Sequence, residues 1–156
     1  MTKTNVMRLL ETAGIEYETL VYDVDESDLS GASVARKTGK DKDIVFKTLV
    51  FSGEKNGYGV CCIPVCEELD LKKTAKAFSE KKVEMLHVKD LLKVTGYIRG
   101  GCSPVGMKKQ FPTVIDETAL LFDKIFLSGG QRGLMLGVDP QKLAGYIGAK
   151  FEDVTM

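Results

Sequence analysis

The chain lacks an excess of charge of either sign, and it lacks an apolar run long enough to cross a bilayer. Lys plus Arg and Asp plus Glu number 22 each, so the formal net charge is zero. A protein that holds long nucleic acid by bulk electrostatics needs a basic face, whereas recognition of a nucleic-acid end needs only a few contacts. Because a signal-peptide pattern is also missing, we expect a cytoplasmic protein with neither DNA nor a membrane as a partner.

Histidine is scarce, and the cysteines show no metal-binding spacing. Cys61, Cys62 and Cys66 lie in one apolar run, where buried thiols are common. Their spacing matches no standard zinc pattern, and the single histidine, His87, is remote from them in sequence. We expect free, reduced thiols in the core, with no metal, no disulfide and no cofactor.

Phosphate-binding loops of the common kinds are missing, although two glycine-rich segments stand out at residues 100–106 and 128–133. Neither has the lysine of a Walker loop or the glycine spacing of a dinucleotide fold. Paired glycines allow positive φ and a close approach of a ligand, and exposed N–H groups can then hold a carbonyl or phosphate oxygen. Two tight turns between strands explain the same glycines equally well.

What the chain does contain is a succession of short helical and strand patterns. Its 156 residues suit one domain, residues 1–156, with a sizeable core. The patterns predict helices at 4–13, 71–78, 88–93 and 140–147, a short helix capped by Ser30 or Ser33, and strands at 17–22, 44–51, 58–64, 82–85, 113–115, 124–128 and 134–137. This order indicates an α+β domain in which short helices flank a mixed, barrel-like sheet.

Lys47 is the unusual residue of the predicted strand 44–51. Period two places Val45, Leu49 and Phe51 on its face, and the opposite face is also apolar. An ammonium on such a face must be paired, neutralised or pointed into a wet pocket, because burying it unpaired costs several kcal/mol. An edge-strand lysine that discourages aggregation is the alternative.

Four motifs occur in order along the chain. They are Phe46-Lys47-Thr48-Leu49-Val50, Glu68-Leu69-Asp70-Leu71-Lys72, Gly100-Gly101-Cys102-Ser103-Pro104-Val105-Gly106-Met107-Lys108-Lys109 and Ser128-Gly129-Gly130-Gln131-Arg132-Gly133. Together they resemble the YbaK/EbsC family of aminoacyl-tRNA deacylases, relatives of the editing domain inserted in bacterial prolyl-tRNA synthetases. The resemblance extends from Val6 to about Ala149.

The resemblance implies a trans-editing hydrolase that cleaves the ester of misacylated tRNA, typically Cys-tRNA(Pro), with tRNA and prolyl-tRNA synthetase as partners. The thiol of the substrate is thought to attack its own ester in such relatives, so no triad is needed. Lys47 and Gly101 match catalytic positions of the family, so the resemblance implies a catalytic role for both. The implied substrate-binding residues are Tyr22, Gly100, Cys102, Ser103, Pro104, Ser128, Gly129 and Arg132.

Departures from the family pattern leave the amino acid open. Ser30 replaces a pocket phenylalanine, Met135 replaces an aspartate, and residues 23–25 replace a histidine-containing loop. Alanine is therefore an alternative substrate, with a bound water in place of the thiol. Two other interpretations remain: a non-catalytic module that binds the tRNA acceptor end or a synthetase, and a hydrolase that uses Cys102 activated by His87.

Overall fold

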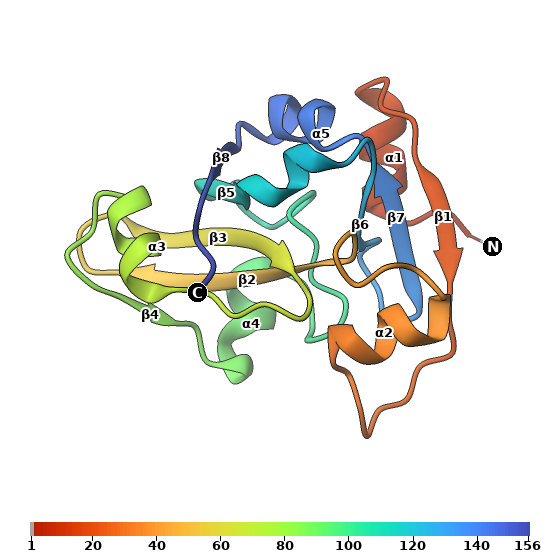
Figure 1. Ribbon diagram of the computed structural model, residues 1–156, viewed down its shortest axis with the longest axis horizontal. Helices are drawn as coiled ribbons and strands as arrows, with labels where there is room; N and C mark the ends of the chain where they lie inside the picture. The colour runs from red at the N-terminus through yellow and green to blue at the C-terminus, as the bar shows by residue number, and fades with distance from the viewer. Residues whose placement is uncertain (1) are drawn as a thin grey trace.

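The computed structural model describes residues 2–156 (Figure 1). Its helices are α1 (Asn5–Thr12), α2 (Gly31–Thr38), α3 (Leu71–Ala77), α4 (Val88–Thr95) and α5 (Pro140–Ile147), with the 3-10 helix η1 (Glu117–Leu121). Its strands are β1 (Glu18–Val21), β2 (Phe46–Gly53), β3 (Gly57–Pro64), β4 (Val83–Met85), β5 (Thr113–Asp116), β6 (Ile125–Ser128), β7 (Leu134–Val138) and β8 (Lys150–Glu152).

The strands form two sheets, and this corrects the expectation of one barrel-like sheet. The larger sheet has the order β4-β2-β3-β5-β8 and is mixed, because β3, β5 and β8 run parallel. The smaller sheet, β1-β7-β6, is antiparallel. Within residues 2–156 one isolated bridge, Val45 to Phe126, links them, and the Phe126 N–H donates to the Ile44 carbonyl at 2.8 Å. The sheets do not close into a barrel because this pairing stops after one bridge; the α+β class and the mixed sheet are confirmed.

Most helix boundaries follow the capping signals in the sequence. Thr4 forms a capping box at the start of α1, and Asp139 accepts two N–H bonds at the start of α5. At α2 the cap is Ser30 rather than Ser33, since the Ser33 N–H donates to the Ser30 hydroxyl. The elements that the sequence patterns missed, η1 and β8, are short and carry little periodicity of their own.

The core confirms the two faces predicted for β2. Phe46 and Val50 pack into the largest apolar cluster, whereas Leu49 and Phe51 pack into a second cluster beneath α3. A third cluster joins α2 to β6 and β7. Of the cysteines, Cys66 is exposed because it lies in the turn after β3, so the expectation that it is buried was wrong.

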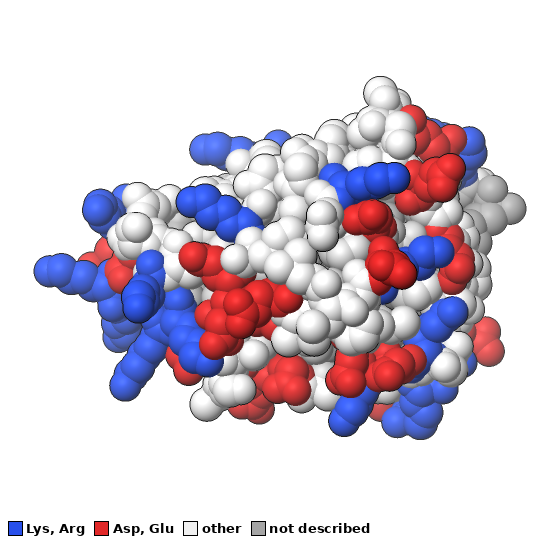
Figure 2. All heavy atoms as spheres, turned by 45° about the horizontal axis from the view of Figure 1, so that its top comes forward, with Lys and Arg blue, Asp and Glu red and all other residues white. Residues whose placement is uncertain are grey.

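Charges of both signs are distributed over the surface. Figure 2 shows lysines gathered at the end formed by α3, β4 and the β2–β3 hairpin, with acidic side chains beside them. Over residues 2–156, no helix has both the length and the apolar character that crossing a membrane requires.

The β2–β3 hairpin is closed by a carboxylate from outside it. Glu80 is 9% exposed, and its oxygens accept the N–H groups of Lys55 at 3.0 Å and Asn56 at 2.6 Å. Gly53 leaves room for this carboxylate, because a Cβ there would lie 2.4 Å from the Glu80 side chain. The loop therefore depends on a residue 24 positions further along the chain.

Replacing Glu80 by alanine should lower the free energy of unfolding by about 2 kcal/mol, since two charge-assisted hydrogen bonds are lost and two N–H groups lose their acceptor. Urea denaturation measures the change. Glu84→Ala removes a largely exposed carboxylate from the neighbouring strand and should change stability by less than about 0.5 kcal/mol. Equal losses in the two variants would contradict the assigned role of Glu80.

Candidate functional site

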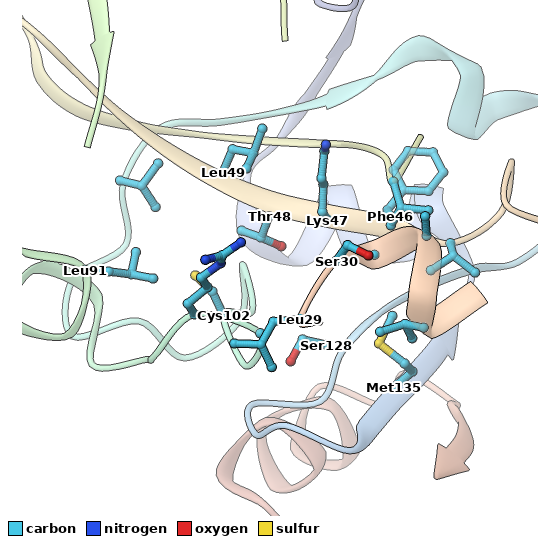
Figure 3. A pocket seen from close by; sticks show the side chains of 18 of the residues that line it. Leu29, Ser30, Phe46, Lys47, Thr48, Leu49, Leu91, Cys102, Ser128 and Met135 are labelled. Carbon is cyan, nitrogen blue, oxygen red and sulfur yellow. The ribbon is translucent and has the colours of Figure 1, made fainter. Parts of the chain in front are cut away.

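A cavity of about 550 Å³ lies between the two sheets (Figure 3). Its volume is in the range of small-molecule pockets. Four segments form its walls: β2, the region from Leu29 through α2, the β4–α4 connection, and the first glycine-rich segment. Ser128 and Met135 of the smaller sheet complete it. The five predicted site residues that line it are Lys47, Tyr22, Gly100, Cys102 and Ser128.

Lys47 lies on the cavity wall and is partly buried. Figure 3 shows Lys47 and Leu49 on one side of β2, with Thr48 on the other, toward Cys102 and Ser128. In this side-chain orientation the ammonium is therefore directed away from Cys102 and Ser128, and the possibility of a lysine pointed into a pocket is not met. Within residues 2–156 no hydrogen bond or salt bridge holds the ammonium, so its flexible side chain can turn toward a ligand.

The two glycine-rich segments pack directly on each other. A Cβ at Gly101 would lie 3.1 Å from Cα of Gln131 and 3.3 Å from N of Arg132. Arg132 Nε donates to the Arg99 carbonyl at 2.8 Å, and the Gly101 N–H donates to the Ile98 carbonyl at 2.9 Å. Gly101 does not line the cavity, and its N–H is already used. Its glycine identity therefore serves the close approach of two backbones.

Other predicted site residues also lie outside the cavity. Ser103 and Pro104 are buried beside a separate hollow of about 10 Å³ against α1, and the Ser103 hydroxyl accepts the Val105 N–H. Gly129 is buried, and its carbonyl accepts the Thr4 hydroxyl at 2.9 Å. Arg132 is partly exposed, with a guanidinium nitrogen 3.8 Å from a Glu26 oxygen. These residues pack outside the cavity and hold the segments that form its walls.

Backbone donors are available at the cavity itself. Gly100 and Cys102 both line it, and within residues 2–156 neither N–H has a hydrogen-bond acceptor in the protein. Gly100 has φ of +85°, a conformation that favours glycine. The Ser128 hydroxyl accepts the Gly130 N–H at 3.2 Å, and the Tyr22 N–H donates to the Gly133 carbonyl at 3.0 Å. Both glycine-rich segments thus fix residues of the cavity wall.

A conventional nucleophile is not assembled here. Burial raises the pKa of the Cys102 thiol to about 12, so the thiolate is scarce at neutral pH. His87 is exposed at the start of α4 and does not line the cavity, as expected for a surface histidine. Over residues 2–156 no group of three His, Cys, Asp or Glu side chains could hold a metal ion.

Of the three departures from the family pattern, Ser30 and Met135 line the cavity and residues 23–25 do not. The Ser30 hydroxyl caps α2 by accepting the Ser33 N–H at 3.2 Å, and Ser30 lines the cavity beside Leu29. Met135 is 5% exposed and packs in the cluster that includes Phe126 and Tyr22. A small polar side chain and a long apolar one therefore shape the wall next to Tyr22.

Several residues that line the cavity were not among the site residues predicted from the sequence. Arg99 lines the cavity immediately before Gly100, and Thr48 lines it beside Lys47. Met85, Val88 and Leu91 form an apolar wall from β4 and α4. The sequence could have indicated Arg99 as a cavity residue, because it stands next to a glycine-rich segment. It could not have indicated the apolar wall, because helical spacing does not distinguish a core face from a cavity face.

The sequence and the fold are those of a known class of protein. The family model for the aminoacyl-tRNA editing domain matches residues 28–146, and the chain belongs to this family. A curated protein of Enterococcus faecalis (strain ATCC 700802 / V583), described as "Putative Cys-tRNA(Pro)/Cys-tRNA(Cys) deacylase EbsC", is 48% identical over 153 residues, which cover 98% of this chain and 93% of that protein. The resemblance to the YbaK/EbsC family is confirmed.

Solved structures share the fold. The "hypothetical protein APE2540" is 22% identical, with a TM-score of 0.88 and coverage of 98% of this chain and 100% of the other. A "putative trans-editing enzyme for prolyl tRNA synthetase" is 24% identical, with a TM-score of 0.81 and coverage of 99% of both chains. At these identities the likeness concerns the fold.

Gly101→Ala should separate the two glycine-rich segments and lower the free energy of unfolding by about 1–3 kcal/mol, because the new methyl group meets backbone atoms that cannot turn away. Gly145→Ala is the matched control: a Cβ there meets nothing within 4 Å, and alanine favours α5 by up to about 1 kcal/mol. Thermal unfolding measures both. An unchanged or raised midpoint for Gly101→Ala would contradict the backbone contact.

The thiols should differ sharply in reactivity. Cys66 is exposed, whereas burial raises the pKa of Cys62 and Cys102 to about 12 and also raises the pKa of Cys61. Near neutral pH we expect Ellman's reagent to modify one thiol rapidly in the native protein and all four in denaturant. Cys66→Ser should remove the rapid phase. A rapid phase that survives this substitution would mean that a cavity thiol is open to solvent.

Proposed function

We propose that the protein is a trans-editing deacylase that hydrolyses the ester of Cys-tRNA(Pro) or Cys-tRNA(Cys). The observation that carries the proposal is the 48% identity, over nearly the whole chain, to the EbsC protein described by that activity. The cavity supports it independently, because its volume suits an aminoacyl group and its wall offers cations and unpaired N–H groups rather than a nucleophile.

The chemistry suits a site without a triad. An aminoacyl ester is already activated, so orientation and stabilisation of the developing oxyanion suffice. In this reaction the substrate thiol sulfur attacks its own carbonyl carbon, and the carbonyl oxygen becomes an oxyanion. The bond to the ribose oxygen then breaks, and the thiol proton is transferred to that oxygen. The products are a cyclic thioester, which water hydrolyses, and uncharged tRNA.

Each donor has a place in this scheme. Gly100 and Cys102 line the cavity and their N–H groups have no protein acceptor in residues 2–156, so these N–H groups are the candidates for binding the oxyanion. The Lys47 ammonium would turn toward the ester oxygen as substrate enters. Tyr22, Ser30 and Met135 would surround the amino-acid side chain. Gly101 and Arg132 would act by holding the Gly100 turn in place.

The partners follow from the substrate. The tRNA would present its aminoacylated 3′ end to the cavity, and prolyl-tRNA synthetase would supply the mischarged tRNA. Both belong to the cytoplasm, which would be the working compartment.

Lys47→Ala should reduce kcat/KM for Cys-tRNA(Pro) by about 100-fold, the usual effect of removing one group that stabilises negative charge developing in the transition state. Cys102→Ala should retain cleavage, because the reaction does not use the protein's thiol. Radiolabelled Cys-tRNA(Pro) and Ala-tRNA(Pro) are the substrates, with ester cleavage as the measurement. Lys42→Ala, an exposed lysine in the connector before β2, is the matched control and should behave as the unaltered protein.

Three outcomes would overturn parts of this proposal. Binding of tRNA without cleavage of either substrate would indicate a non-catalytic module. Loss of cleavage in Cys102→Ala, with folding intact by circular dichroism, would indicate a cysteine hydrolase. Preferential cleavage of Ala-tRNA(Pro) would exclude attack by the substrate thiol and require water instead.

A further inference from the structure

The charged residues that line the cavity are basic, although the Lys47 side chain lies on the other side of β2 from Cys102 and Ser128 in this structure. Among the described residues 2–156, its lining includes Lys47 and Arg99 but neither Asp nor Glu. Apolar walls focus such a field, because they screen it less than water does. The cavity therefore favours a ligand that carries a negative charge, and a neutral or cationic aminoacyl group does not supply one.

Arg99 is the better placed of the two cations to bind that charge. Its carbonyl accepts Arg132 Nε at 2.8 Å, and the bond from the Gly101 N–H to the Ile98 carbonyl closes the turn that carries it. The backbone of Arg99 is thus fixed at the cavity wall. Within residues 2–156 its guanidinium has no hydrogen bond or salt bridge, whereas Arg36 and Arg132 each lie 3.8 Å from a carboxylate oxygen.

The wall also offers an apolar surface. Met85 is 39% exposed and Val88 61% exposed, and both line the cavity together with Leu91. Such side chains can pack on the face of a base and remove apolar surface from water, whereas free phosphate has no apolar surface to bury. A planar guanidinium binds phosphate oxygens through two parallel hydrogen bonds. The combination suits a nucleotide better than a free anion.

We infer that Arg99 forms a phosphate-binding subsite for the 3′-terminal nucleotide of the substrate, with the base against the wall of β4 and α4. This inference rests on the proposed function and deepens it. Arg99 binds the phosphate and so positions the ester, while Lys47 acts at the ester itself. Arg99 is accordingly a positioning residue for the reaction and a binding residue for the nucleotide.

The test compares substrates with and without phosphate. Arg99→Ala should raise KM about 10- to 100-fold for Cys-tRNA(Pro) and for 3′-cysteinyl adenosine 5′-monophosphate, with little change in kcat. For 3′-cysteinyl adenosine, which has no phosphate, KM should be unchanged. Arg99→Lys should give an intermediate KM, because charge remains but the paired hydrogen bonds do not. Arg8→Ala, which removes an exposed arginine of α1 outside the cavity, is the matched control.

A binding measurement separates this inference from the proposed function. With uncharged tRNA, Arg99→Ala should lower the slope of log affinity against log salt by about 0.7 to 1, and this readout needs no turnover. An equal KM change with and without phosphate, or an unchanged salt slope, would overturn the subsite. Inhibition by inorganic phosphate as strong as that by adenosine 5′-monophosphate would contradict recognition of a nucleotide and indicate a site for a free anion. Absence of cleavage with an altered salt slope would overturn the proposed function alone.

Discussion

The contact between the two glycine-rich segments is the constraint on which the cavity depends. Gly101 lies against the backbone of Gln131 and Arg132, and Arg132 Nε binds the Arg99 carbonyl. These contacts join a turn after α4 to a loop between β6 and β7. Gly100, Cys102 and Ser128 keep their places at the wall because of this contact. A site of loops acquires in this way the rigidity that catalysis by orientation requires.

Electrostatics supplies the second requirement. The cavity lining combines the basic residue Arg99 with apolar side chains and with residues whose backbone N–H groups are unpaired in residues 2–156, and burial raises the pKa of the lining thiol Cys102 to about 12. Such a surface holds negative charge that arises on the ligand and offers no competing nucleophile of its own. In the proposed reaction the ester carries its own thiol, so the protein would have to hold the reacting atoms and stabilise the oxyanion.

Local signals in the sequence predicted most of the helices and strands. The features that the sequence did not predict depend on contacts between distant residues. Thr4 and Asp139 determine helix starts through bonds to the next few residues, so their signals are complete in the sequence. Gly101 is different, because the reason for its glycine lies 30 residues away in Gln131. The direction of Lys47 was equally hidden, since period two assigns a residue to a face of β2 without saying which face the cavity occupies.

The single bridge between the sheets has a consequence for the shape of the cavity. Lys47 and Thr48 belong to the larger sheet, whereas Ser128 and Met135 belong to the smaller one, and Val45 paired with Phe126 is the backbone bridge between them in residues 2–156. The cavity therefore lies between two separately hydrogen-bonded layers, which the largest apolar cluster packs together. Val45 lines the cavity and Phe126 packs in one cluster with Met135, so a substitution at the bridge changes the spacing of the layers and the wall of the cavity together.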